Sequence, residues 1–294
     1  MSGALLLQSL ILGLLLGGLY ALLAAGLTLY FGVMRVVMIA HASFLILAAY
    51  IAWFLNDRIG IDPLLAVLVS APLFFGIGVA MQRVLISRLK PATLTMMSVL
   101  LTFAIALTIE GTLGVLFSGT QRRIQLPYSS TSLQFFGASV PVVKLVAFGL
   151  AAASLLALFL LLKKSRFGWA LRATIQNKEA AELVGIDTKK IAGYGFGLGL
   201  ATAAVGGTAL SLDATIWPAL HWHWIGPLMA IIVVGGLGSI PGAAIAAIVL
   251  GVGQSMLQLP LGTTWAQTVF YVALFATLIF RPQGFFGGRL AQRF

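Results

Sequence analysis

The chain has 294 residues, of which 60% are hydrophobic and only 9% are charged, and its mean hydropathy is +1.06. Soluble domains carry about 25% charged residues, so the composition excludes a soluble globular protein. The net charge is +11, which we attribute to basic residues that flank apolar segments rather than to nucleic acid binding.

The charged residues leave long apolar runs between them, and a membrane-crossing helix needs about 20 apolar residues. These runs are too long for strands and lack the alternation of a membrane β-barrel. Because the backbone must satisfy its own hydrogen bonds in hydrocarbon, we expect helices. Before residue 214 the runs predict spans at 5–30, 36–55, 63–81, 92–117, 142–162 and 191–213.

The sequence predicts one transmembrane domain over residues 1–294. Its longest polar connection, residues 163–190, is too short for a separate soluble domain. The first apolar run lacks a basic leader and is too long for a cleavable signal peptide, so we interpret it as a retained helix. The chain has no cysteine, which excludes disulfides, thiol catalysis and thiolate metal sites.

Lysine and arginine residues indicate the orientation, because cytoplasmic connections carry an excess of them. If the connections 31–35, 82–90 and 163–190 and the tail after 281 are cytoplasmic, they hold 14 of the 18 basic residues. The cytoplasmic set is Arg35, Arg83, Arg88, Lys90, Lys163, Lys164, Arg166, Arg172, Lys178, Lys189, Lys190, Arg281, Arg289 and Arg293. The other side keeps Arg58, Arg122, Arg123 and Lys144.

This orientation requires an odd number of crossings in the uncharged stretch 214–280. We expect three, at 225–237, 241–259 and 264–281, with a turn at the glycine-rich segment Gly235–Gly242. The first of the three is short, which predicts a broken or re-entrant segment near 225–242. The predicted fold is an all-α polytopic helical bundle with nine crossings and an external N-terminus; eight and ten crossings are the alternatives.

The connection 163–190 contains the most informative motif. Helix-forming residues 177–184 end at Gly185, a residue type that favours the C-terminal cap of a helix. Composition alone fits a solvated amphipathic loop helix. The spacing Glu-Ala-Ala-x-x-x-Gly, formed here by Glu179, Ala180, Ala181 and Gly185, resembles the coupling-helix motif of ABC importer permeases.

Over nearly its whole length the chain resembles permease subunits of the branched-chain amino acid ABC transporter family. The matching segments are 17–22, 26–29, 31–35, 40–41, 48–50, 171–173, 179–181 and 235–242. Members often carry an Asn-Phe-Ala-His-Gly-Glu run in the second helix, where this chain reads Met38-Ile39-Ala40-His41-Ala42-Ser43. The resemblance therefore bears on the class of transporter more than on the transported ligand.

The resemblance implies a subunit that moves a branched-chain or related small amino acid across the bacterial inner membrane. It implies four kinds of partner: a second permease, identical or paralogous, two cytoplasmic ATPases, and a periplasmic binding protein that delivers the ligand. The ATPases would dock on Arg172, Glu179, Ala180, Ala181 and Gly185 in the coupling loop 163–190. The chain has no G-x-x-x-x-G-K-[ST] motif, so we expect neither enzymatic activity nor a cofactor in it; partner subunits would use the ATP.

Candidates for the translocation path or gate are His41, Glu110 and the glycine-rich turn with Gly235, Gly236, Gly238, Pro241 and Gly242. His41 is interpreted first as a hydrogen-bonded packing residue. Glu110 is an acid within a span, where a charge costs a few kcal/mol, and it either lines the path or faces outer water. The turn either permits a tight reversal or forms an inner gate.

The aromatic run His221-Trp222-His223-Trp224 is interpreted as an interfacial anchor outside the membrane, in preference to a metal site. The sequence places no catalytic constellation. The alternative to an ABC permease is an ion-driven secondary transporter or channel. That class predicts several intramembrane ionisable groups or inverted repeats, and the sequence offers one acid and no evident repeat.

Overall fold

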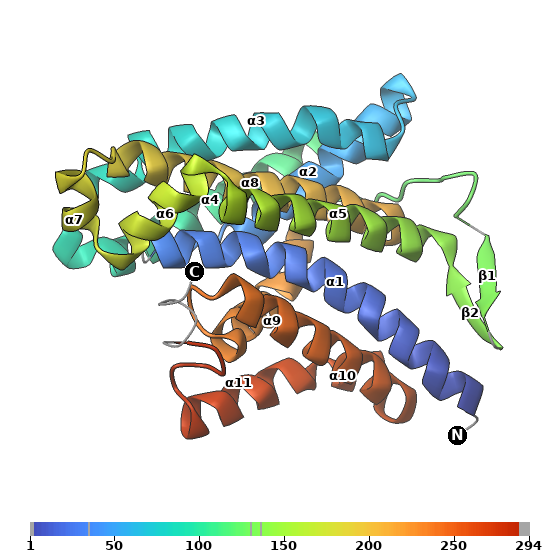
Figure 1. Ribbon diagram of the computed structural model, residues 1–294. Helices are drawn as coiled ribbons and strands as arrows, with labels where there is room; N and C mark the ends of the chain where they lie inside the picture. The colour runs from blue at the N-terminus through green and yellow to red at the C-terminus, as the bar shows by residue number, and fades with distance from the viewer. Residues whose placement is uncertain (1–2, 35, 130, 136, 288–294) are drawn as a thin grey trace.

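The computed structural model describes residues 3–34, 36–129, 131–135 and 137–287, so Arg35, Arg289 and Arg293 lie outside the described residues. The fold is the predicted all-α bundle, with one small hairpin added (Figure 1). The helices are α1 (Gly3–Met34), α2 (His41–Phe54), α3 (Pro63–Val84), α4 (Leu94–Phe117), α5 (Val142–Lys164), α6 (Arg166–Gln176), α7 (Lys178–Leu183), α8 (Thr188–Asp213), α9 (His221–Gly235), α10 (Ile240–Ala266) and α11 (Thr268–Phe280).

Over the described ranges, eight helical segments are long and apolar enough to cross a membrane, and the apolar helix α11 adds a shorter ninth. The helices run roughly along one axis, which gives the molecule two ends (Figure 1). One end, the α7 end, carries α6, α7 and the segment that follows α11. The other, the hairpin end, carries the start of α1 and strands β1 (Ser132–Phe135) and β2 (Ala138–Pro141).

The uncharged stretch after α8 makes three passes, as predicted. α8 ends at the hairpin end, where Asp213 forms an ion pair with Lys144 at the start of α5. α9 then runs to the α7 end, α10 returns, and α11 brings the chain back (Figure 1). α10 is kinked after Pro260, because Gly262 has φ 78° and ψ 172°.

The second predicted span is wrong at its start. Residues 36–40 are not helical; they form an extended stretch and a turn, and α2 begins only at His41. No charge, glycine or proline marks this break in the sequence. Thr102 on α4 satisfies its backbone: the Thr102 hydroxyl accepts from the N–H of Ile39 and lies within donating distance of the carbonyl of Val37, both at 3.3 Å. Irregular backbone at this depth is tolerated because protein covers it.

The seventh span also differs from its prediction. It begins with a 3₁₀ turn at Pro218–Leu220 and continues as α9 from His221, rather than starting at 225. The aromatic run 221–224 is therefore the first turn of a bundle helix and not part of an external connection. α9 has 15 residues, about 22 Å, which is shorter than the roughly 30 Å hydrocarbon core. The helix is short, as predicted, but it is continuous over His221–Gly235, and the irregular stretch lies before it at residues 214–220.

The two halves of the bundle follow the same plan in opposite directions. α1 is long, the chain breaks, and a short α2 starts at a histidine; α8 is long, the chain breaks, and a short α9 starts at a histidine. α1 packs against α10, and α8 packs against α3. Both contacts use glycine: a Cβ at Gly17 would lie 2.8 Å from Ile248 Cα, and one at Gly197 would lie 2.8 Å from Phe75 O. The repeat that the sequence did not reveal exists as an arrangement of helices.

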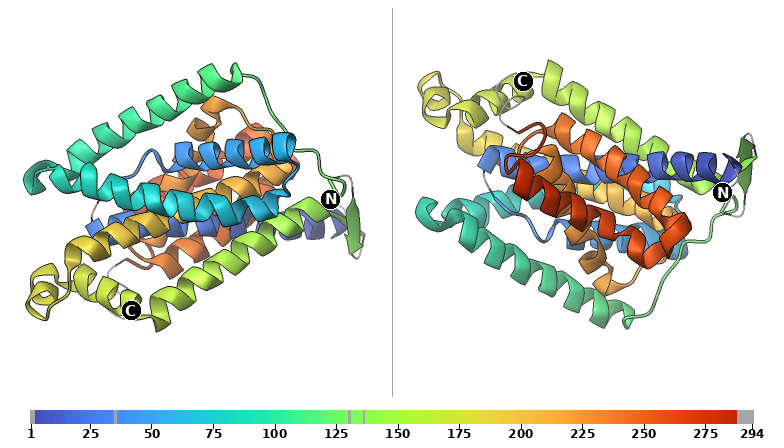
Figure 2. Two further views of the ribbon diagram at one scale, coloured as in Figure 1. Left: turned by 90° about the horizontal axis from the view of Figure 1, so that it is seen from above. Right: turned by 90° about the horizontal axis from the view of Figure 1, so that it is seen from below.

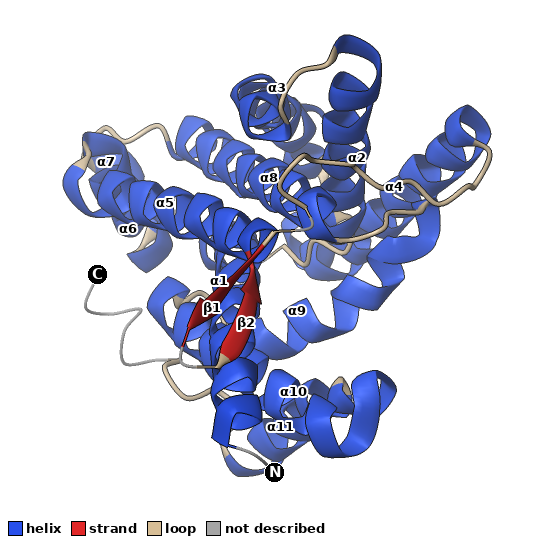
Figure 3. Ribbon diagram, turned by 90° about the vertical axis from the view of Figure 1, so that its right-hand side faces the viewer, coloured by secondary structure: helices blue, strands red, loops and turns tan. Residues whose placement is uncertain are grey.

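α4 lies at one edge of the bundle, as both views in Figure 2 show. Among helices it packs mainly against α2, and it touches the 3₁₀ turn before α9. At the hairpin end the two strands lie over the starts of α1 and α5 (Figure 3), and β2 contacts both helices. The sequence prediction did not include these strands, which pair antiparallel through a turn at Gly137, where φ is +84°.

Candidate functional site

The connection between α5 and α8 folds into two short helices at the α7 end of the bundle. α6 is amphipathic and packs on α5 and α8, while α7 projects beyond it (Figure 1). Asn177 begins α7 by accepting the N–H of Ala180 at 3.0 Å, and Gly185 ends it with φ +85°. The predicted short helix with a glycine stop is confirmed, and α6 was not predicted.

α7 presents an apolar tip to solvent. Leu183 is 88% exposed and Val184 is 76% exposed, and a Cβ added at Gly185 would meet nothing within 4 Å. Glu179 and Ala180 are exposed beside this tip, and Ala181 is buried against the rest of the connection. Leu183 and Val184 therefore form an exposed apolar tip on a projecting helix.

Two polar groups fix the connection to the bundle. Glu182 Oε1 accepts the hydroxyl of Thr188 at 2.5 Å, which ties α7 to the start of α8. Asp187 caps α8, and hydrogen bonds from the backbone N–H and side chain of Lys190 lower the pKa of the Asp187 carboxyl. These contacts set the position of the apolar tip.

Arg172 lies on α6 and is only partly buried. Its Nη1 donates to the carbonyl of Leu162 near the end of α5 at 2.5 Å, and its guanidinium lies 5.6 Å from the centre of the Trp169 ring. Arg172 therefore holds α6 to α5 within this chain. A direct contact of Arg172 with an ATPase stays a prediction.

The glycine-rich segment forms a tight turn between α9 and α10. Gly236 and Gly238 have φ of +99° and +85°, and the N–H of Ser239 donates to the carbonyl of Gly236 at 3.0 Å. Pro241 lies in the first turn of α10, where proline is favoured. The N–H of Phe285 donates to the carbonyl of Val234, so the chain after α11 covers the turn.

This turn adjoins the coupling connection, as the sequence suggested. One apolar pocket is lined by both segments, with Gly238 and Pro241 on one side and Lys163 and Arg172 on the other. Ile240 also packs against a buried apolar cluster that includes Leu171 of α6. A displacement of α6 would therefore also displace the glycine-rich turn. Gating by this turn stays a prediction.

His41 is buried in the core, with 1% of its surface exposed. Its Nδ1 lies 3.3 Å from the hydroxyl of Tyr30, and the two rings pack edge to face. Its Nε2 has no hydrogen-bond partner among the described residues. This geometry agrees with the packing interpretation of His41.

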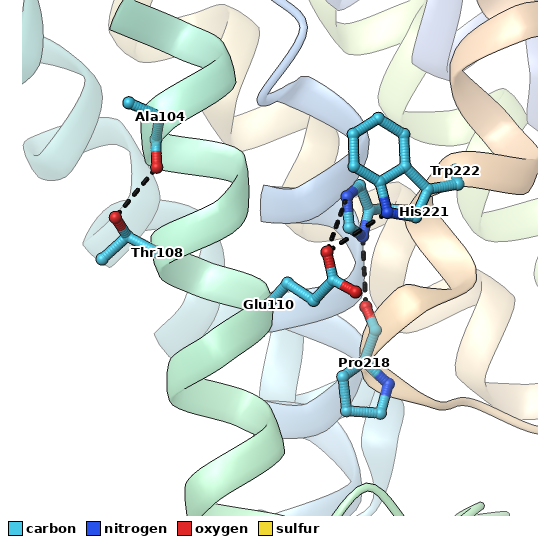
Figure 4. A network of polar contacts seen from close by, with 6 residues as sticks. All are labelled: Ala104, Thr108, Glu110, Pro218, His221 and Trp222. Atoms are coloured by element: carbon cyan, nitrogen blue, oxygen red, sulfur yellow. Dashed lines mark hydrogen bonds and ion pairs between the residues drawn. The ribbon is translucent and has the colours of Figure 1, made fainter.

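Glu110 reaches from the middle of α4 to the first turn of α9 (Figure 4). The indole N–H of Trp222 donates to Glu110 Oε2 at 3.2 Å, and the Nε2 atom of His221 lies 3.8 Å from the same oxygen. Glu110 is seven residues from the end of α4 at Phe117, about 10 Å along the helix axis. The acid therefore lies inside the bundle's length and faces a protein partner rather than only outer water.

The structure does not join the candidate residues into one site. Glu110 lies with α9, His41 lies in the core beside α1, and the glycine-rich turn lies at the α7 end. Among the residues that the structure describes, no three His, Asp or Glu side chains come close enough to hold a metal ion.

The chain resembles known proteins of one family. The sequence model of the family described as "Branched-chain amino acid transport system / permease component" matches residues 9–279. The chain belongs to this permease family. Its helical bundle and its predicted resemblance are thereby confirmed together.

The permease is similar to curated proteins of the same kind. It is 28% identical to the high-affinity branched-chain amino acid transport system permease protein LivH of Salmonella typhimurium, covering 96% of this chain and 95% of the relative. It is 30% identical to the probable LivH of Methanocaldococcus jannaschii, covering 92% and 89%. A solved chain of PsaBC from Streptococcus pneumoniae, in complex with Fab, matches 96% of this chain and 92% of its own at 16% identity and a TM-score of 0.47, and we infer nothing from it.

Sequence reasoning missed three residues of the permease that the structure brings forward. Leu183 and Val184 read as ordinary helix formers, and only the structure shows that both are strongly exposed at the tip of α7. His221 read as an interfacial residue, although it is 1% exposed and faces Glu110. The sequence holds part of this information, because Glu110 stands out as a charged residue within a span. It does not identify His221 as the partner of Glu110, because the two residues are 111 positions apart.

Proposed function

We propose that the chain is a transmembrane permease subunit of an ABC importer that moves a branched-chain or related small amino acid across the bacterial inner membrane. The proposal rests on family membership together with one structural observation, the projecting helix α7 with its exposed apolar tip. The tip of this helix makes few contacts within the chain, because Leu183 and Val184 are largely exposed. It fits a groove on a cytoplasmic partner.

The orientation follows from charge. Among the described residues, the basic side chains Arg83, Arg88, Lys90, Lys163, Lys164, Arg166, Arg172, Lys178, Lys189, Lys190 and Arg281 lie toward the α7 end. The excess of lysine and arginine marks this end as cytoplasmic. Helix α7 then lies where a cytoplasmic ATPase docks, and two such ATPases would serve a pair of permeases.

A second permease subunit, identical or paralogous, completes the proposed path. Ionisable groups within a membrane face protein or water rather than lipid, and Glu110 and Trp222 remain partly exposed on the free face of α4 and α9. We propose that the second permease covers this face, and that a periplasmic binding protein delivers the amino acid to the hairpin end. No cofactor is expected in this chain, and ATP is used by the partner subunits.

A reconstituted transporter tests the proposal. The permease, its partner permease, the ATPases and the binding protein are placed in proteoliposomes, and uptake of labelled leucine is measured with and without internal ATP or ion gradients. We expect uptake that needs ATP and the binding protein and is unchanged by ionophores. Uptake driven by an ion gradient without ATP would support the secondary transporter instead.

A further inference from the structure

Side chains of α4 and α9 meet so that one hydrogen-bonding position stays open (Figure 4). The Nδ1 atom of His221 lies 3.1 Å from the carbonyl oxygen of Pro218. Because a carbonyl only accepts, Nδ1 carries the hydrogen, and the neutral imidazole then presents a lone pair on Nε2. This Nε2 is buried without a hydrogen-bond partner and faces Glu110 Oε2 at 3.8 Å. Two acceptors therefore face each other, and the gap needs a donor.

The gap belongs to a built site rather than to a loose surface. His221 is 1% exposed, and its ring orientation is fixed by Pro218. Trp222 is held by its hydrogen bond to Glu110 and by packing against Phe103, with ring centroids 5.9 Å apart. The side chain of Glu110 keeps 28% exposure, so a ligand can reach its carboxylate from the free face of α4 and α9.

The carboxyl group of Glu110 lies beside the first turn of α9. The indole N–H of Trp222 also donates to it. A carboxylate and an imidazole lone pair together favour a positively charged donor with several hydrogens.

We infer that Glu110 and His221 bind the primary ammonium group of the transported amino acid, an inference that rests on the proposed function. The nitrogen would lie about 2.9 Å from each acceptor and to one side of the line that joins the two atoms, which are 3.8 Å apart. Two of its three hydrogens bond to Glu110 and His221, and the third is free for the second carboxylate oxygen.

A proton shared by Glu110 and His221 would fill the same gap without any ligand. The experiment must therefore separate an ammonium ligand from a proton. Three small probes do this: leucine; isopentylamine, which keeps the amine and the apolar chain; and 4-methylpentanoate, which keeps the apolar chain and the carboxylate but has no amine.

Saturation-transfer NMR on the full permease pair in nanodiscs, without the binding protein, detects weak binding of each probe. We expect signals from leucine and isopentylamine, competition between the two, and no competition from 4-methylpentanoate. Equal signals from all three probes, or none from the two amines, would overturn the ammonium site.

Substitutions test which residues bind the amine. We expect Glu110→Gln to weaken isopentylamine binding about tenfold or more, because a charged hydrogen bond is lost, and His221→Phe to weaken it less. The matched control is Thr108→Val on the same helix, since the Thr108 hydroxyl bonds only to the carbonyl of Ala104 in its own helix. Unchanged amine binding in a Glu110→Gln variant that still assembles would assign the amine to another place. The probe series on the unaltered protein decides the chemistry even if that variant fails to assemble.

The uptake assay keeps the two hypotheses apart. ATP-driven leucine uptake without amine-selective binding would leave the proposed function standing and remove the ammonium site. Amine-selective binding that depends on Glu110, in a transporter that does not import leucine with ATP, would remove the proposed function alone.

Discussion

At the scale of single residues, the backbone conformation of Gly236 restricts which side chains can replace it. Its φ is +99°, and a Cβ there would lie 2.4 Å from the backbone nitrogen of Gly287. We expect Gly236→Val to lower stability by roughly 2 kcal/mol or more, from the strained backbone and the clash. Thermal unfolding in detergent and the fraction of assembled transporter measure this effect.

Two further variants separate a turn from a gate. Gly149→Val on α5 is the control, since a Cβ at Gly149 meets nothing within 4 Å. Gly238→Val, with φ +85° but looser surroundings, tests the segment more gently. If Gly238→Val assembles and keeps its ATPase activity while uptake falls, the segment acts as a gate; if it only fails to assemble, the segment is a structural turn.

Asp187 gives a pH-dependent prediction outside the membrane. Its carboxyl pKa is lowered by hydrogen bonds from Lys190, so its stabilising effect is present above the unfolded value of about 3.9 and is lost as the pH falls through the lowered pKa. Hydrogen exchange of the Lys190 amide, corrected for intrinsic rates, should lose protection as the pH falls from above about 3.9 through the lowered pKa of Asp187. Asp187→Asn removes the titration, so the same pH dependence in that variant would contradict the assignment.

At the scale of elements, helix α7 should act through its tip. We expect Leu183→Asp to abolish transport and ligand-stimulated ATPase activity without changing the fold, because Leu183 touches little in its own chain. Gly185→Trp should have the same effect, with an added backbone cost from φ +85°. Pull-down of the ATPase and ATPase rates in proteoliposomes measure both.

The control for the tip is Trp169→Ala on α6. Trp169 is also strongly exposed and apolar, and it lies on α6, where its ring packs against Arg172. Normal ATPase coupling in Leu183→Asp and Gly185→Trp would exclude α7 as the docking element.

The sequence predicted elements well where the physics is local. Charge-free runs fixed most membrane helices to within a few residues, and Gly185 predicted the end of α7. The predictions were wrong where a residue distant in the sequence determines the local structure. Residues 36–40 read as helix, because only Thr102, more than 60 positions away, shows how their backbone is satisfied. The start of α9 was misplaced for the same reason, since the partner of its first turn is Glu110.

At the scale of the whole molecule, three passes after α8 place the segment following α11 at the end that carries α7. The chain has no cysteine, so single cysteines can report this. An impermeant thiol reagent on intact cells should label Ser129→Cys and should not label Asn177→Cys or Gln283→Cys. Labelling of Gln283→Cys would mean two passes after α8; position 292 would serve equally but lies outside the described residues.

Trp222 is unsuitable as a labelling site for the outer side of the membrane. The sequence placed it in an outer connection, whereas the structure places it in α9 against Glu110. We expect Trp222→Cys to react slowly compared with Ser129→Cys, because α4 covers one side of it. The inverted plan of α1–α3 and α8–α10 was also invisible in the sequence, since it repeats the arrangement of helices and not their residues.

α4 mechanically links the two breaks in the bundle. Through Thr102 it supports the backbone that leads into α2, and through Glu110 it contacts the first turn of α9. The two residues are eight positions apart on one helix, about 12 Å, so α4 behaves as a stiff rod between them. Because both residues lie on one continuous helix, a displacement of α4 at Glu110 would also displace Thr102. Whatever occupies the start of α9 therefore alters the support beneath the start of α2.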